Sequence, residues 1–276
     1  MDYSEIIVLF ASIFFTYRFF FRWYRYVSRN MRLIQNESLR TLLYIFPAIP
    51  LIIILYTLIN LASFDVTGSG LWIIFYLLIG YMWLNFSMFV MFFFFDLSWI
   101  DDAINMVNPA AAIAIIGGGL GVTVIYSGAN VGDGPGWWCV FLAGGLGLCS
   151  WIILGVLVNA FTGVFRKITV GRDVPCAIRT GAYLLSGGII LGRASAGDWT
   201  SFSQTVLEFG DGWPVIILTC IFILLEIASH TSVKQDRQSK DARLYYSLLL
   251  GVIYIAAAIL TLYLLPPLPI NPMYGR

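Results

Sequence analysis

Arg179 and Glu226 are the residues of this sequence whose type and position could most directly do chemistry inside a membrane. Each lies within a strongly apolar run, where an ionisable side chain is costly to bury unless it is paired and is therefore a functional candidate. Arg179 stands near the start of one run and Glu226 near the end of the next, so we expect both at similar depth on neighbouring helices. A structural ion pair is the first interpretation, partly because Arg179 is close enough to the interface to snorkel. An ion-transport site is the second.

Asp133 and Asp198 form a second acidic pair, and a glycine precedes each of them. Gly-Asp is typical of a turn, since glycine adopts positive φ and aspartate accepts hydrogen bonds from the backbone that follows it. The alternative is a pair of carboxylates at an outer pore mouth or cation site. We favour the turn, and the matched placement of the two residues keeps the alternative open.

Glycines are concentrated within two of the apolar runs. The first run holds Gly117, Gly118, Gly119 and Gly121, and the second holds Gly181, Gly187 and Gly188. A phosphate-binding loop would need a preceding strand and a following helix N-terminus, whereas these glycines lie in the middle of a run. Small residues let membrane helices approach closely, so the pattern predicts a helix-packing seam.

Little else in the sequence indicates catalysis. The chain has one histidine and four cysteines, without a CxxC pair, which disfavours a zinc site or a disulfide framework. No nucleophile, base and orienting group can be assembled from these residues. The net charge is +1, and no Lys/Arg cluster is long enough to suggest nucleic-acid binding. We therefore expect no enzyme activity, no metal and no cofactor.

The elements that would position these residues are duplicated. Residues 108–134 and 173–199 align without a gap at an offset of 65, so that Gly132-Asp133 falls on Gly197-Asp198. Each copy then reaches a Gly-Trp step and a further apolar run. The repeated unit is a helix, a turn and a second helix, which in this composition is a membrane hairpin.

Composition places the whole chain in a membrane. Of its 276 residues, 59% are hydrophobic and 11% are charged, well below the charged fraction of soluble domains. We predict an all-α, polytopic membrane protein, with a lipid bilayer as its surroundings. Eight runs approach the length that crosses the hydrocarbon layer: residues 4–21, 41–62, 70–95, 109–128, 136–160, 175–192, 212–229 and 243–265.

The basic residues predict an orientation for these eight spans. They gather in three connections: Arg22, Arg25, Arg29, Arg32 and Arg40 after the first span, Arg166, Lys167 and Arg172 after the fifth, and Lys234, Arg237, Lys240 and Arg243 after the seventh. With eight spans, these connections share one side of the membrane. The positive-inside rule makes that side cytoplasmic and puts both termini on the other side. Both repeats then enter from the same side, so they are parallel repeats.

Composition also divides the chain into three parts. Residues 1–100 read as an aromatic-rich module of three spans. Residues 101–230 are the duplicated module, with repeat 1 over about 108–160 and repeat 2 over about 173–230. Residues 231–276 hold a basic connection, a closing helix and a proline-rich tail. In repeat 2 the Gly-Trp step comes later, and residues 200–211 predict a short amphipathic segment on the outer membrane surface.

The duplicated unit resembles a known family. The pattern is Asn-Pro-Ala-Ala-Ala-Ile at 108–113, followed by Gly-Asp and Gly-Trp, with Ala-Ile-Arg-Thr-Gly at 177–181 in the second copy. It is similar to domain-of-unknown-function family 350, the YjfL-like bacterial inner-membrane proteins, over about residues 95–230. The resemblance implies a bacterial inner-membrane location and no established activity. The genes of some members lie near genes for envelope-stress proteins.

These observations favour a non-enzymatic membrane subunit that works as a homo-oligomer or with other membrane proteins. The alternative is a channel or transporter for a small ion, which would use Asp133 and Asp198 outside and Arg179 and Glu226 within the span. A dry, close-packed bundle would favour the subunit, and a hydrophilic cavity at mid-membrane depth would favour transport.

Overall fold

The computed structural model describes residues 2–30, 37–198, 201–233 and 240–265. Within these ranges, eight helical segments are long and apolar enough to cross a membrane, as predicted. They are Tyr3–Arg29, Leu39–Asn60, Gly70–Phe95, Pro109–Gly128, Trp137–Thr162, Val174–Ala194, Phe202–Ser229 and Asp241–Leu264. The expected proline-rich tail and most of the expected basic connection before Lys240 lie outside the described residues.

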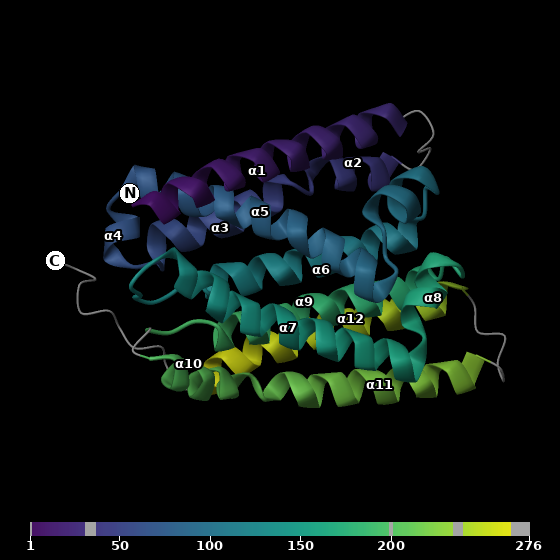
Figure 1. Cartoon of the computed structure of the whole chain (residues 1–276). Coiled ribbons are helices and arrows are strands. Elements are labelled where there is room, and N and C mark those ends of the chain that lie inside the picture. The colour runs from purple at the N-terminus through teal and green to yellow at the C-terminus, as the bar shows by residue number, and fades with distance from the viewer. Residues whose placement is uncertain (1, 31–36, 199–200, 234–239, 266–276) are drawn as a thin grey trace.

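The long helices lie side by side in one bundle (Figure 1). They are α1 (Tyr3–Asn30), α3 (Ala48–Asn60), α5 (Gly70–Phe95), α6 (Pro109–Gly128), α7 (Trp137–Thr162), α9 (Val174–Ala194), α11 (Pro214–Val233) and α12 (Lys240–Leu264). The short elements are α2 (Glu37–Ile45), α4 (Phe64–Thr67), the π-helical turn η1 (Trp99–Asn105), α8 (Val164–Thr169), α10 (Phe202–Phe209) and the 3₁₀ turn η2 (Gly210–Gly212). The start of α1, α4 and α10 lie at one end of the bundle, and α8 lies at the other (Figure 1).

One expectation about the N-terminal part needs correction. The first helix does not end near residue 21 but continues to Asn30, so Arg22, Arg25 and Arg29 lie on α1 and not in a connection. The second span lies where it was predicted, over Leu39–Asn60, and it consists of two helices, α2 and α3. They are separated at Phe46-Pro47, because proline cannot supply the N–H that a continuous helix requires. The predicted segment at 200–211 contains the short helix α10, none of whose residues is buried.

Equivalent residues of the two repeats cap the starts of α6 and α9. The Asn108 side chain accepts hydrogen bonds from the backbone N–H groups of Ala110 and Ala111, at 3.0 and 3.3 Å. Asp173, 65 positions later, accepts from the N–H of Cys176 at 3.1 Å. Side-chain oxygens at the N-cap satisfy N–H groups that have no partner inside the helix. The Asn108 amide also donates to the carbonyl of Ile168 at 2.9 Å, which ties the start of α6 to the end of α8.

The most extensive helix contact in the bundle is between α6 and α9. These helices run parallel and touch through their backbones. A Cβ added at Gly117 would lie 2.3 Å from the carbonyl oxygen of Gly181, and one at Gly128 would lie 1.9 Å from that of Gly192. Between them, Gly121 and Gly188 face each other, since a Cβ on Gly188 would lie 2.4 Å from the Gly121 Cα. We call this contact, formed by Gly117, Gly121, Gly128, Gly181, Gly188 and Gly192, the glycine interface.

The other glycines of the predicted seam face side chains instead. A Cβ on Gly118 would lie 2.6 Å from the sulfur of Met91, and one on Gly119 would lie 2.7 Å from the ring of Phe46. A Cβ on Gly187 would lie at an ordinary van der Waals distance, 3.7 Å, from the side chains of Trp151 and Val215. The run Gly117–Gly121 is therefore not one packing face. Gly117 and Gly121 meet α9, and the two glycines between them accommodate side chains of other helices.

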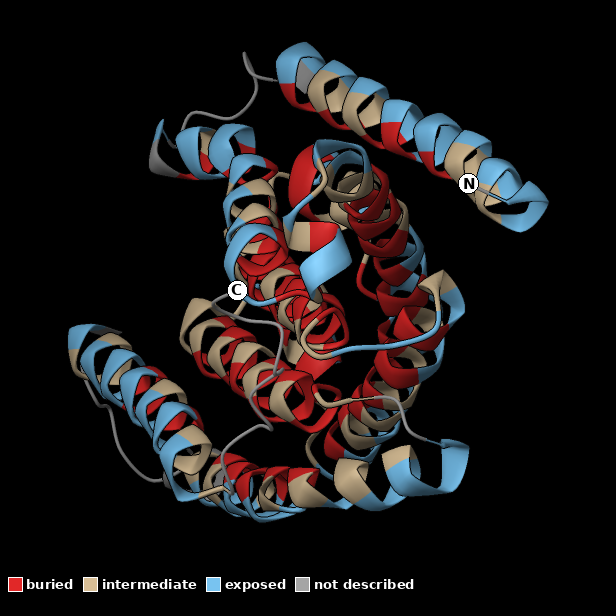
Figure 2. Ribbon diagram, turned by 90° about the vertical axis from the view of Figure 1, so that its left-hand side faces the viewer, coloured by how far each residue is buried: buried red, intermediate tan, exposed pale blue. Residues whose placement is uncertain are grey.

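The central position of α6 and α9 determines which residues are buried. The buried residues of α6 and α9 lie at the centre of the bundle, while the outer faces of the surrounding helices are exposed (Figure 2). One continuous cluster of buried apolar side chains runs from Phe19 on α1 to Tyr254 on α12. The exposed outer faces carry large apolar residues, including Phe10 and Phe93. Lipid covers such faces in a membrane protein.

The glycine interface predicts a clear difference between two Gly→Ala variants. Gly121→Ala places a methyl group 2.5 Å from the Leu184 carbonyl oxygen, so we expect a loss of about 1–3 kcal/mol of stability from overpacking. Gly145→Ala is the matched control on α7, where no atom lies within 4 Å of the added methyl. It should be neutral or slightly stabilising. Thermal unfolding in detergent measures both; equal melting temperatures for the two variants would contradict the interface.

Candidate functional site

A buried ion pair links α9 to α11. The Arg179 guanidinium contacts both carboxylate oxygens of Glu226: Nε meets Oε1, and Nη2 donates to Oε2 at 2.9 Å. A third helix, α12, contributes Ser247, whose hydroxyl accepts a hydrogen bond from Arg179 Nη1 at 2.6 Å. Arg179 is 7% exposed, Glu226 1% and Ser247 0%. The structure thus brings together the two charged residues that the sequence placed at similar depth.

A second layer of polar contacts lies one to two helical turns from this pair, since Tyr183 follows Arg179 by four residues and Thr219 precedes Glu226 by seven. The hydroxyls of Tyr183 on α9 and Thr219 on α11 are 2.9 Å apart, and both residues are buried. Ser186 and Tyr254 belong to the same level of α9 and α12, and their buried hydroxyls have no protein partner among the described residues. The Phe222 ring stacks on Tyr183, with centroids 4.5 Å apart. We refer to both layers together as the polar network.

The direction of each hydrogen bond can be assigned. Thr219 donates its only hydroxyl proton to the Val215 carbonyl at 2.7 Å, so Tyr183 must be the donor to Thr219. In the same way, Ser247 donates to the Arg243 carbonyl at 2.8 Å while it accepts from Arg179. Both chains of donors therefore end on backbone carbonyls. An arginine does not release its proton in a protein, so these contacts hold helices together and do not form a proton relay.

Sequence reasoning missed most of the polar network. It identified Arg179 and Glu226 but not Tyr183, Ser186, Thr219, Ser247 or Tyr254. A usable signal was present: polar pairs seven residues apart occur in all three helices, as Arg179/Ser186, Thr219/Glu226 and Ser247/Tyr254. Seven residues are nearly two full turns, so each pair shares one helix face. Singly, serine, threonine and tyrosine in an apolar run do not indicate a site.

Another ion pair lies nearer the end of the bundle. Arg243 Nη2 is 3.3 Å from Asp173 Oδ2, and both side chains are about one-third exposed. This pair joins the start of α12 to the N-cap of α9. Because it is partly solvated, it contributes little to stability compared with a buried pair.

The other predicted pair, Asp133 and Asp198, joins the turns of the two hairpins. The N–H of Asp133 donates to Asp198 Oδ1 at 2.8 Å, and the N–H of Gly197 donates to the Val131 carbonyl at 3.0 Å. Gly132 and Gly197 both have positive φ, +107° and +153°, as a Gly-Asp turn requires. These contacts favour the structural interpretation, because one carboxylate is occupied by the neighbouring turn.

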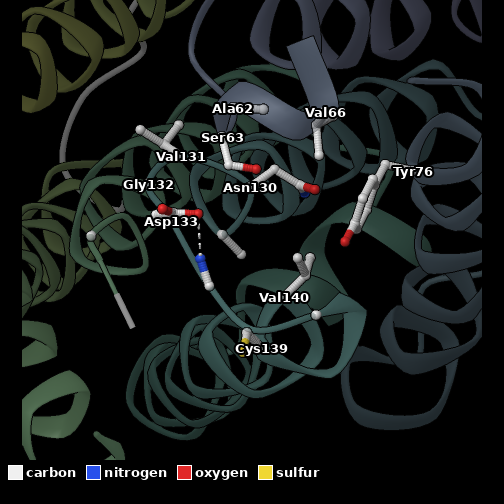
Figure 3. A pocket seen from close by; sticks show the side chains of 14 residues that line it. Ala62, Ser63, Val66, Tyr76, Asn130, Val131, Gly132, Asp133, Cys139 and Val140 are labelled. Atoms are coloured by element: carbon white, nitrogen blue, oxygen red, sulfur yellow. Dashed lines mark hydrogen bonds between the residues drawn. The ribbon is translucent and has the colours of Figure 1, made fainter. Parts of the chain in front are cut away.

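A small pocket lies beside these turns (Figure 3). Ser63, Tyr76 and Asn130 lie around it, with Gly132 and Asp133 at its edge, and Ala62 forms an isolated backbone bridge to Gly132. Its volume is about 30 Å³, which is room for one or two water molecules and far less than a small-molecule site needs. Among the described residues, no group of three His, Cys, Asp or Glu side chains could hold a metal ion.

The fold and the site together define a polytopic α-helical membrane protein in which Arg179 and Glu226 form an ion pair inside the bundle. No family model, no curated protein and no solved structure matches this chain.

The ion pair predicts an unusual order of stability among its variants. Glu226→Gln leaves a buried guanidinium without a counter-charge, so we expect a loss of about 3–5 kcal/mol. The double variant Arg179→Met, Glu226→Leu removes both charges and should recover most of that loss. Arg243→Gln, which breaks the partly exposed pair, is the control and should cost less than about 1 kcal/mol. Thermal unfolding in detergent gives the order; a double variant no more stable than Glu226→Gln would contradict a purely structural pair.

Proposed function

We propose that this chain is a non-enzymatic integral membrane subunit that acts as an oligomer or through contacts with other membrane proteins. In this proposal the bundle does not itself carry a solute. The observation that supports it most is that the hydrogen-bonding groups around the Arg179–Glu226 pair are satisfied within the bundle. Both oxygens of Glu226 are occupied by Arg179, and the hydroxyl donors that extend from the pair end on backbone carbonyls.

The packing at the centre of the bundle supports the same proposal. In the glycine interface, α6 and α9 approach so closely that a single methyl group does not fit at Gly117, Gly121 or Gly128. A solute path between these two helices would require them to separate. The interface also uses the glycines that could otherwise have joined two copies of the chain. Association must therefore use the exposed, lipid-facing surfaces of the outer helices.

We further propose a bacterial inner-membrane location with both ends of the chain outside the cytoplasm. The resemblance to domain-of-unknown-function family 350 remains a prediction. From it we take only the inner-membrane location and a link to envelope stress. The orientation has separate support. One end of the bundle holds α8, the end of α1 and the start of α12, which carry Arg166, Arg25 and Arg243. The other end holds α10, which includes Glu208 and is followed by Asp211 (Figure 1).

A channel or transporter for a small ion is the second candidate. The observation in its favour is that the buried hydroxyls of Ser186 and Tyr254 lack a protein partner. Unpaired polar groups in an apolar interior are costly, and a passing ion or water would satisfy them. Transport would then run through the polar network, with Arg179 and Glu226 at its inner layer.

Flux measurements on the purified protein in proteoliposomes, together with cross-linking in cells, distinguish the two candidates. If the chain is a subunit, proteoliposomes should show no protein-dependent flux of H⁺, Na⁺, K⁺ or Cl⁻ by ion-sensitive dyes. Cross-linking in cells followed by mass spectrometry should give the same partners for the parent and for the double variant Arg179→Met, Glu226→Leu. Flux that the parent supports and the double variant loses would overturn the subunit proposal in favour of transport.

Cysteine labelling tests the orientation. All four native cysteines are first replaced, and single cysteines are placed at Gly134, in the turn between α6 and α7, or at Gly171, in the turn before α9. We expect an impermeant thiol reagent added to intact spheroplasts to label the Gly134 position and not the Gly171 position. The reverse pattern would invert the proposed topology.

A further inference from the structure

The outer face of α1 carries a groove that combines aromatic rings with an arginine. The groove has a volume of about 390 Å³ and is lined by Tyr17, Phe20, Phe21, Tyr24 and Arg25. Its rings are ordered by neighbouring contacts: Phe20 and Tyr24 stack with centroids 6.2 Å apart, and so do Tyr17 and Phe21 at 5.8 Å. The Arg25 guanidinium lies over the Phe21 ring, 5.8 Å from its centroid. The groove is thus apolar along most of its length and cationic at one end.

Arg25 also belongs to a line of positive charge. Arg18, Arg22, Arg25 and Arg29 follow one another at spacings of four, three and four residues, which places them on one face of the helix. The groove lies beside this face, and Arg25 belongs to both. Among the described residues Arg25 makes no ion pair with a carboxylate. A guanidinium without a carboxylate partner at the polar end of a membrane helix is suited to an anionic group in the lipid headgroup region.

We propose that this groove binds an anionic phospholipid. An acyl chain lies along Tyr17, Phe20 and Phe21, and the phosphate pairs with the Arg25 guanidinium. Two features of the structure support this occupant over others. The groove is lined by residues of α1 alone, and α1 belongs to the least buried of the eight spans, where lipid is the natural neighbour. Its charge is positive and unpaired, which complements a phosphodiester with a net negative charge. This inference does not depend on the proposed function, because either a subunit or a transporter would have lipid at this surface.

The positive charge of the site favours the binding of anionic lipids over zwitterionic lipids. In phosphatidylcholine the choline cation accompanies the phosphate, so its net attraction to the arginine face is small. In phosphatidylglycerol the phosphate charge is uncompensated. A basic residue near the membrane surface contributes about 1 kcal/mol to the binding of anionic lipid, which corresponds to about a fivefold change in affinity. Arg29 has the same charge and lies one turn further along the same helix, but it does not line the groove.

Native mass spectrometry of the full chain in detergent, titrated with phosphatidylglycerol or phosphatidylcholine, tests the proposal. The parent should bind phosphatidylglycerol more tightly. Arg25→Gln should weaken that binding about fivefold and leave phosphatidylcholine binding unchanged. Arg25→Lys, which keeps the charge, should retain most of the preference, and Arg29→Gln should stay within about twofold of the parent. Melting temperatures equal to the parent value show that the variants are folded, as expected for exposed side chains.

Three results would overturn the proposal. The parent could bind both lipids equally. Arg25→Gln and Arg29→Gln could weaken binding equally, which would indicate diffuse surface charge and no defined groove. Arg25→Gln could instead dissolve a dimer of the parent, which would show that the groove is occupied by a second copy of the chain.

Discussion

The structure depends on one constraint: α6 and α9 touch through their backbones. Lipid is as apolar as a leucine side chain, so burying apolar surface gives membrane helices little reason to associate, and close contact between them must supply the attraction. Glycines on matching faces provide that contact over several turns, from Gly117 and Gly181 to Gly128 and Gly192. The remaining helices then pack around this pair. The contact also fixes the two hairpins parallel and brings their turns close enough for Asp133 and Asp198 to hydrogen-bond.

The helix α9 carries both main features of the bundle on opposite faces. Gly181, Gly188 and Gly192 face α6, while Arg179 and Tyr183 lie on the opposite side of α9 and contact α11 and α12. The glycine face therefore packs by close backbone contact, and the opposite face packs through directed hydrogen bonds and an ion pair. The polar face has an additional effect on specificity, since an arginine buried in an apolar bundle has few positions where its charge and its donors are all satisfied. Pairing with Glu226 and Ser247 selects one arrangement of α11 and α12 against α9.

The sequence was sufficient for the spans, and it was insufficient for contacts that depend on tertiary packing. Composition and run length located all eight spans, and the placement of Arg179 and Glu226 suggested their pairing. By contrast, the end of α1 at Asn30 was missed, because arginines on a helix and arginines in a loop look alike in a sequence. Gly118 and Gly119 were grouped with Gly117 and Gly121, although they face Met91 and Phe46. The polar network was missed because hydroxyl residues are common in apolar helices, and only the shared spacing of three helices marks them as one group.

We infer that water does not reach the polar network, and a cysteine at position 186 tests this inference most directly. Ser186→Cys changes one buried atom in the layer where hydroxyls lack partners. In a background without native cysteines, its reaction with a small hydrophilic thiol reagent is measured in membranes, and a cysteine at the exposed Gly134 position serves as the positive control. The account predicts no labelling at position 186 under conditions that label position 134 completely. Rapid labelling at position 186 would show a water path through the bundle and would contradict the account.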